Sequence, residues 1–281
     1  MQILENPEEF QMLCLEWRAQ GQDLALVPTM GAYHAGHQSL MRAAKAAGDR
    51  VLISLFVNPA QFGPNEDLAA YPRDPERDAA IAEAAGADVL FMPDSHAMYA
   101  PGHATWVELP VLARTLCGIS RREHFKGVCT VVLKLLLLSQ ANSAFFGEKD
   151  WQQLTLIRCM VRDLNFPVEI RGCPTIREAD GLALSSRNIY LTPEERAQAP
   201  QLQAGLQQAR ELVRRGEQSA EVLYAAVRKY WRRHLPMGRE EYLSIVHPHS
   251  LENRESIGEG ALMACAVRLG KARLIDNILL P

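Results

Sequence analysis

Apolar runs of three to seven residues alternate with amphipathic segments over the first 175 residues. The runs at 24–28, 51–57, 88–92, 144–146 and 168–171 have the composition of buried strands. Helices are predicted at 38–47, 75–85, 127–139 and 152–164, after an opening helix that Asn6 caps and Gly21 ends. This alternation predicts an α/β fold with a mostly parallel sheet and helices on both faces. Ligands of such sheets bind beyond the carboxyl ends of the strands.

The pattern changes near residue 175. A capping box, Thr192 with Glu195, opens a predicted helix that runs to about residue 215, and Ser219 caps another that runs to about residue 234. Strand-like runs follow at 242–246, 262–267 and 273–276. We therefore expect two domains, residues 1–175 with the parallel sheet and residues 176–281 with a smaller mixed α/β arrangement.

Composition is that of an ordinary soluble protein, with 281 residues, 48% hydrophobic, 22% charged and a net charge of −3. Because no basic stripe is present, we do not expect nucleic acid as a partner. The longest apolar stretch, 131–138, contains Lys134 and is too short to span a membrane. The six cysteines lack metal or redox spacing and the N-terminus resembles no signal peptide, so we expect free thiols and a cytoplasmic location.

The first strand–helix junction carries two histidines three residues apart. It reads Pro28-Thr29-Met30-Gly31-Ala32-Tyr33-His34-Ala35-Gly36-His37. Such a junction offers backbone N–H groups and the positive end of a helix dipole, which together favour a phosphate group. Two alternatives are a metal-binding pair and two surface histidines without a ligand. A zinc site is disfavoured because no further ligands lie at suitable spacing, and we expect no protein-bound metal.

Other predicted loops have the composition of ligand-binding segments. Asn58 and Gln61 follow the second strand and offer amides that orient a polar ligand without adding charge. Lys149 and Asp150 open a later helix, where they suit a phosphate and a ribose hydroxyl. Seen singly, the first of these loops is equally an ordinary turn, whereas the second favours an acidic helix cap beside a solvated lysine over a ligand site.

Two further loops combine cations with small polar residues. Ser185, Ser186 and Arg187 lie in a segment, 180–188, that joins the two predicted domains, and they suit an anion. A serine-rich linker is the alternative there. The basic loop at 121–127 precedes a helix, but taken singly it favours a solvated surface loop over a ligand site. Since the chain has no P-loop, dinucleotide fingerprint or serine elbow, nucleotide binding would depend on the histidine junction.

The histidine junction resembles the His-x-Gly-His signature of the nucleotidyltransferase superfamily. Together with the segments 58–62, 71–73, 146–153, 180–188 and 274–277, it resembles the pantothenate synthetase family over residues 4–277. The resemblance implies a Rossmann-like domain that binds nucleotide and pantoate (1–175) and a smaller C-terminal lid (176–281). It also implies an ATP-dependent ligase that condenses D-pantoate with β-alanine through pantoyl adenylate, with release of AMP and pyrophosphate. Magnesium would act with ATP, and the protein would be a homodimer.

The resemblance implies the following site residues. The catalytic residues are His34, His37, Lys149, Ser185, Ser186 and Arg187. The ATP-binding residues are Pro28, Thr29, Met30, Gly31, His37, Gly147, Lys149, Asp150, Ile176, Leu184, Ser185, Ser186 and Arg187. The pantoate-binding residues are Met30, Asn58, Gln61 and Gln153.

The chain departs from the family pattern at three places. Tyr33 replaces a usual leucine, and Ala35 stands where an acidic residue is common. Arg122 and Glu123 replace a Pro-Gly pair, which changes the stiffness of that loop, so Arg121 is carried over only as a candidate phosphate or substrate contact.

Two rival functions remain open at this point. Another nucleotidylyltransferase would need a pocket for a phosphorylated second substrate, whereas the amides at positions 61 and 153 suit a small hydroxy acid. A non-catalytic nucleotide-binding protein would be expected to lack at least one of the four residues His34, His37, Lys149 and Arg187, and all four are present.

Overall fold

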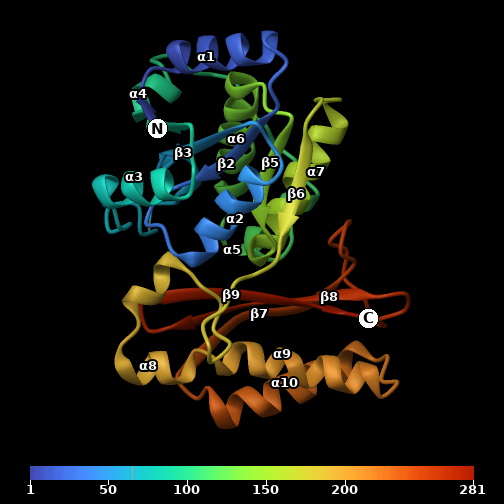
Figure 1. The fold of residues 1–281 in the computed structure, drawn as a ribbon. Helices are drawn as coiled ribbons and strands as arrows, with labels where there is room; N and C mark the ends of the chain where they lie inside the picture. The colour runs from blue at the N-terminus through green and yellow to red at the C-terminus, as the bar shows by residue number, and fades with distance from the viewer. Residues whose placement is uncertain (65) are drawn as a thin grey trace.

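A six-stranded parallel sheet forms the N-terminal part of the computed structural model, which describes residues 1–64 and 66–281 (Figure 1). All neighbouring strands run parallel. In spatial order they are β1 (Gln2–Leu4), β4 (Val89–Phe91), β3 (Arg50–Leu55), β2 (Leu24–Thr29), β5 (Ser143–Gly147) and β6 (Glu169–Cys173). The predicted sheet is confirmed. The sequence pattern missed β1, because this edge strand has only three residues and two of them are exposed.

Helices cover both faces of this sheet, as predicted. Alternate residues of β2 point to opposite faces, so Leu24 and Leu26 pack with α1 (Pro7–Ala19), α6 (His124–Ser139) and α7 (Trp151–Asp163). Ala25 and Val27 pack with α2 (Ala35–Lys45) and α3 (Pro75–Ala84). The remaining short helices of this part are η1 (Pro59–Gln61), α4 (Ser95–Met98), η2 (Leu112–Arg114), α5 (Cys117–Ser120) and η3 (Glu148–Asp150).

The C-terminal part is a three-stranded antiparallel sheet with two helices against one face (Figure 1). Its strands are β7 (Gly238–Val246), β8 (Ala261–Leu269) and β9 (Ala272–Leu280). The helices α9 (Gln201–Arg214) and α10 (Ala220–His234) lie on the side away from the parallel sheet. The mixed α/β character is confirmed, while the boundary near residue 175 and the lid role stay predictions.

One helix prediction in this part is wrong. The segment predicted as a single helix from residue 193 to about 215 is divided into α8 (Pro193–Gln198) and α9, after the five-residue 3-10 helix η4 (Ser186–Tyr190). The helix breaks at Pro200, because proline has no N–H to continue the hydrogen-bond ladder. The capping box of Thr192 and Glu195 is confirmed.

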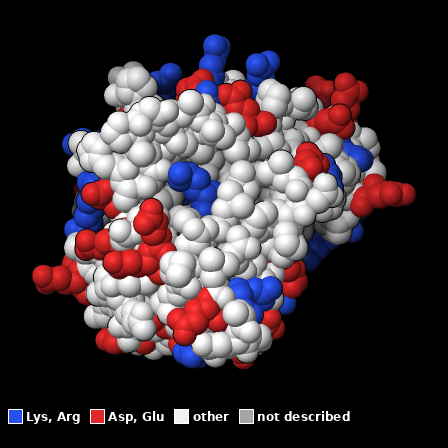
Figure 2. Space-filling model, turned by 90° about the horizontal axis from the view of Figure 1, so that it is seen from above, with Lys and Arg blue, Asp and Glu red and all other residues white. Residues whose placement is uncertain are grey.

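The surface charge and the thiols agree with the composition. Acidic and basic side chains are interspersed over the face seen in Figure 2. All six cysteines are free. Among the described helices, none combines the length and apolar character needed to cross a membrane.

Candidate active site

Two adjoining cavities lie at the candidate site. The larger lies between the segment after β5 and the C-terminal part, and the smaller is at the carboxyl ends of β2 and β5, where the strand order switches direction. Their volumes are about 370 and 220 Å³, and they share Lys149, Asp150, Gln153, Ser185 and Arg187 in their walls. A switch point of this kind is where open α/β sheets bind ligands. The smaller cavity gathers most of the residues expected from the sequence: Pro28, Thr29, Met30, His34, His37, Gln61, Gly147, Lys149, Asp150, Gln153, Ile176, Leu184, Ser185, Ser186 and Arg187.

The two histidines lie in the first turn of α2, which begins at Ala35 rather than at the predicted residue 38. His34 is the N-cap, and its Nδ1 accepts from the N–H of Gly36 at 3.1 Å. The Nδ1 of His37 accepts from the N–H of His34 at 3.4 Å. Since a neutral imidazole has one N–H, both rings carry their proton on Nε2. Each histidine therefore has one donor left for a ligand oxygen at a helix N-terminus.

Both histidines are neutral at neutral pH. Burial and then the charge of Lys149 lower the pKa of His34 to about 4. Burial, His34 and Lys149 lower the pKa of His37 to about 3. The rings lie 4.1 Å apart between centroids, so two imidazolium ions would repel each other strongly. The pair therefore acts through directed N–H groups, while Lys149 supplies positive charge nearby.

Two positions of the junction need glycine, because a Cβ there would come too close to a neighbouring side chain. A Cβ on Gly36 would lie 2.9 Å from the imidazole of His34, which rests on that backbone. Gly31 has φ +83°, and a Cβ there would lie 2.8 Å from the carboxylate of Asp78. Gly31, expected to bind ATP, lines neither cavity, and its visible role is to let the loop pass Asp78.

Asp78, which the sequence analysis did not single out, fixes the histidine loop. It lies on α3 with only 1% of its surface exposed. Its two carboxylate oxygens accept from the N–H of Ala32 at 2.7 Å and of Tyr33 at 2.8 Å. The signal in the sequence was a carboxylate four residues before buried Ala82, on the apolar face of the predicted helix.

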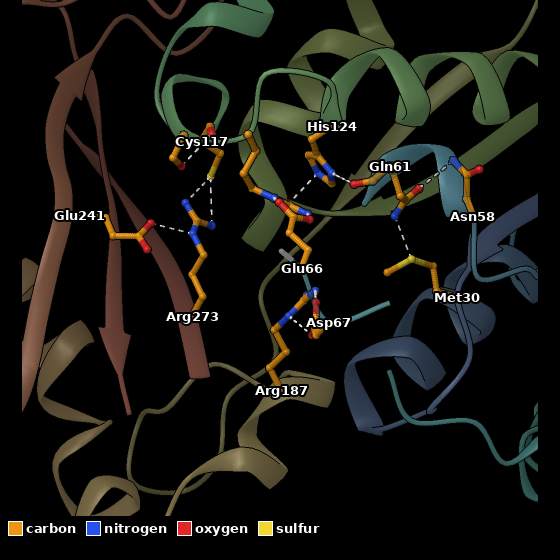
Figure 3. Close-up of polar contacts among 12 residues, drawn as sticks. Met30, Asn58, Gln61, Glu66, Asp67, Cys117, His124, Arg187, Glu241 and Arg273 are labelled. Atoms are coloured by element: carbon orange, nitrogen blue, oxygen red, sulfur yellow. Dashed lines mark hydrogen bonds and ion pairs between the residues drawn. The ribbon is translucent and has the colours of Figure 1, made fainter. Parts of the chain in front are cut away.

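Gln61 is held in place by a network of neutral groups (Figure 3). Its Nε2 lies 2.8 Å from the Sδ of Met30, and its Oε1 accepts from the Nδ2 of Asn58 at 3.2 Å. Asn58, only 1% exposed, also donates to the carbonyl of Gly127 and accepts from the hydroxyl of Tyr99. Asn58 lines neither cavity, so the structure places it behind Gln61 rather than against a ligand.

His124 joins Gln61 to Arg121. Its Nδ1 lies 2.7 Å from the carbonyl oxygen of Gln61, and its Nε2 lies 3.0 Å from Nη1 of Arg121. Arginine only donates and a carbonyl only accepts, so His124 is neutral with its proton on Nδ1. Burial and then the charge of Arg121 lower its pKa to about 4. Arg121 lines the larger cavity although the two residues after it depart from the family pattern.

The C-terminal part of the chain supports the loop that carries Lys149. Asn277 on β9 donates to the carbonyl oxygens of Glu148 and Lys149 at 2.9 and 3.0 Å. Next to it, Asp276, 3% exposed, forms a bidentate ion pair with Arg177. These contacts explain why the segment 274–277 belongs with the site although it is remote in sequence.

Comparison with known proteins agrees with this geometry. Residues 2–279 match the family model described as pantoate-β-alanine ligase. The pantothenate synthetase of Nitratidesulfovibrio vulgaris (strain Miyazaki F) is 61% identical over 280 residues, covering all of this chain and 99% of that protein. The chain belongs to this family. The family prediction made from the motifs is therefore confirmed.

Solved structures of the family have the same fold. A pantothenate synthetase from Thermus thermophilus superposes with a TM-score of 0.92 at 46% identity, over 99% of both chains. A pantoate-β-alanine ligase from Francisella tularensis superposes with a TM-score of 0.80 at 34% identity, over 99% of this chain and 97% of that one. The latter structure is described as a complex with β-γ ATP and β-alanine.

Replacing Asp78 with Asn should loosen the histidine loop. Asparagine keeps the size but has one acceptor oxygen, so one buried N–H loses its partner, at a cost of about 1–3 kcal/mol. We expect the free energy of unfolding to fall by that amount and nucleotide affinity to fall with it. Asp163→Asn, an exposed carboxylate at the end of α7, is the control. An unchanged nucleotide affinity in Asp78→Asn would contradict the role given to Asp78.

The partly buried, neutral histidines His34, His37 and His124 predict a stability that falls in mild acid. Their pKa values of about 3 to 4 lie below the unfolded value of about 6.5, so only the unfolded chain takes up protons between these limits. We expect the free energy of unfolding to fall by about 2–4 kcal/mol between pH 6.5 and 5. Carboxyls with lowered pKa, such as Glu241, contribute stability that is lost only below about pH 4.5.

Urea unfolding at several pH values measures this dependence. The double variant His34→Asn/His37→Asn should flatten the slope between pH 6.5 and 5. His96→Asn, at an exposed position, should leave it unchanged. A double variant with the wild-type slope would show that these two histidines do not carry the effect.

Proposed function

We propose that this protein joins D-pantoate to β-alanine with ATP, forming pantothenate and releasing AMP and pyrophosphate. The observation that carries the proposal is one cavity lined both by two neutral amides, Gln61 and Gln153, and by a group of elements suited to phosphate. Those elements are the α2 N-terminus with its two histidines, Lys149 and the Ser185–Arg187 segment. Family membership and the ligands named for the Francisella tularensis structure support the same reaction.

In the proposed first step, a carboxylate oxygen of pantoate attacks the α-phosphorus of ATP. The bond between that phosphorus and the bridging oxygen breaks, and pyrophosphate leaves with the electron pair. Two anions meet, so the site must supply several donors and cations aimed at one place. The Nε2–H groups of His34 and His37 donate to phosphate oxygens, and Lys149 and Arg187 balance the charge that develops on pyrophosphate.

Neutral groups suit the pantoate end of the cavity. An ion pair with a lysine or arginine would stabilise the pantoate carboxylate and weaken it as a nucleophile. Gln61, 7% exposed and held by Met30 and Asn58, presents an amide without charge. Apolar side chains of α6, Val128, Val131 and Val132, complete the wall and suit the methyl groups of pantoate.

In the proposed second step, the amine of β-alanine attacks the carbonyl carbon of pantoyl adenylate. The bond from that carbon to the phosphate oxygen breaks, and AMP leaves. The larger cavity adjoins the first through Lys149 and Gln153 and offers about 370 Å³ for the second substrate. Holding the intermediate between the two parts of the chain protects it from water.

Magnesium enters this proposal as the partner of ATP. Mg²⁺ in nucleotide sites keeps several waters and binds through phosphates with one or two carboxylates. Among the described residues no cluster of three or more possible ligands is present, and Asp150 beside Lys149 offers a single carboxylate to the cavity. That donor set fits a cation carried mainly by phosphate, which would add positive charge at the triphosphate.

The resemblance also implies a cytoplasmic homodimer whose C-terminal part acts as a lid. The contacts of Asn277 with the Lys149 loop support a link between the two parts of the chain. Sedimentation of the purified chain tests the dimer.

Pantoate-dependent exchange of labelled pyrophosphate into ATP tests the proposed function. With Mg²⁺ and without β-alanine, we expect exchange, because formation of the adenylate is reversible. Lys149→Ala and Arg187→Ala should each lower the exchange rate by about 10²–10³-fold, since both act on developing phosphate charge. Lys229→Ala, on the exposed face of α10, is the control. Exchange that does not require pantoate would contradict the proposal.

A further inference from the structure

Two neighbouring carboxylates, Glu66 and Asp67, hold two arginines of the candidate site (Figure 3). Glu66 pairs with Arg121, and Asp67 pairs with Arg187. All four residues line the larger cavity. The four side chains are only 15–27% exposed, so these pairs are less screened by solvent than ordinary surface ion pairs.

The contact between Asp67 and Arg187 uses an edge of the guanidinium that also suits phosphate. Nε and Nη2 of Arg187 donate to the two oxygens of Asp67 at 3.0 and 2.9 Å. A phosphate presents two oxygens at a similar spacing, and arginine binds either group in this forked manner. Burial lowers the pKa of Arg187, but the hydrogen bonds and charge of Asp67 outweigh it and raise the pKa overall.

Arg121 is occupied in the same way. Its Nε donates to one Glu66 oxygen at 2.7 Å, and its Nη2 donates to the other. Its Nη1 donates to Nε2 of His124 at 3.0 Å. Burial raises the pKa of the Glu66 carboxyl, yet the hydrogen bonds and charge of Arg121 leave it below its ordinary value. Three of the five N–H donors of Arg121 are engaged, so the fork formed by Nε and Nη2 is open to an incoming anion only if Glu66 moves aside.

The residues after Asp67 contact the same serine–arginine segment. The hydroxyl of Tyr71 lies 3.3 Å from the Oγ of Ser186, and the guanidinium of Arg187 lies 5.8 Å from the centre of the Tyr71 ring. Tyr190, at the end of η4, donates to the carbonyl oxygen of Ala70 at 2.9 Å. The segment 66–71 therefore packs against the serine–arginine residues that are proposed to hold the triphosphate.

We propose that Glu66 and Asp67 are positioning residues that occupy the arginine forks in place of substrate anions, and that ATP displaces Asp67 from Arg187 when it binds. This inference rests on the proposed function and adds a competition within the same site. Before ATP binds, Asp67 holds the guanidinium of Arg187 in a fixed orientation. The same carboxylate opposes binding of the anionic nucleotide, because its ion pair with Arg187 must break and its charge must move away.

The Asp67→Asn variant tests this competition. Asparagine keeps the shape of aspartate but removes its charge and one acceptor, so the arginine fork is released more easily. We expect the Kd of a non-hydrolysable ATP analogue with Mg²⁺, measured by calorimetry, to fall 3- to 10-fold. The KM for ATP should fall similarly while the KM for pantoate stays unchanged. A purely structural role of Asp67 would instead raise the Kd or lower kcat without this split.

The control is Asp163→Asn, which removes the same charge from an exposed pair with Arg162 on α7. It should leave both constants unchanged. Asp67→Ser, shorter and equally neutral, should tighten ATP binding as Asp67→Asn does, and thermal unfolding checks that each variant is folded.

The possible outcomes separate the two proposals. If the wild type binds the analogue and supports pantoate-dependent exchange, but neither folded Asp67 variant binds more tightly, the competition is refuted and the proposed function stands. If the wild type neither binds the analogue nor supports pantoate-dependent exchange, both are refuted.

Discussion

The buried carboxylate of Asp78 is the contact on which the candidate site most depends. It accepts the backbone N–H groups of Ala32 and Tyr33 and so fixes the turn between β2 and α2. That turn sets His34 as the N-cap of α2 and brings His37 into the first helical turn. From there, two backbone N–H groups choose the tautomers of both rings. A single carboxylate on α3 therefore directs two Nε2–H donors at the helix N-terminus, where a phosphate is stabilised.

The rest of the site divides its work between neutral and charged groups. Gln61, Asn58 and Tyr99 form a chain of neutral hydrogen bonds on one side. On the other side, Lys149 and two arginines supply charge, and carboxylates of the same protein hold those arginines. This separation suits a reaction in which one anion must remain a good nucleophile while another is neutralised. His124 contacts both Gln61 and Arg121, so hydrogen bonds connect the neutral side of the site to the charged side.

Much of this arrangement was predictable from sequence because it is local. Strand and helix periods predicted the parallel sheet, and the His-x-Gly-His run identified the junction that lines the smaller cavity. The sequence did not reveal partners that meet through the fold. Asp78 and Tyr99 lie in segments that no motif marked, and the order of the strands brings them to the site. Asn277 lies in the marked segment 274–277, but its hydrogen bonds to the Lys149 loop could not be predicted from the sequence. The helix break at Pro200 was missed because amphipathic periodicity continues across it. Asn58 was expected at the substrate, although its side chain is fully engaged in supporting Gln61.

The most direct test of this account is ¹⁵N NMR of the histidine side chains with and without a non-hydrolysable ATP analogue and Mg²⁺. Before the nucleotide is added, at pH 6.5, His34 and His37 should both be neutral with the proton on Nε2. On addition, both Nε2 signals should shift, as expected for donation to phosphate oxygens. A cationic ring at pH 6.5 in the free protein, a proton on Nδ1, or Nε2 signals that do not respond to the nucleotide would contradict the account.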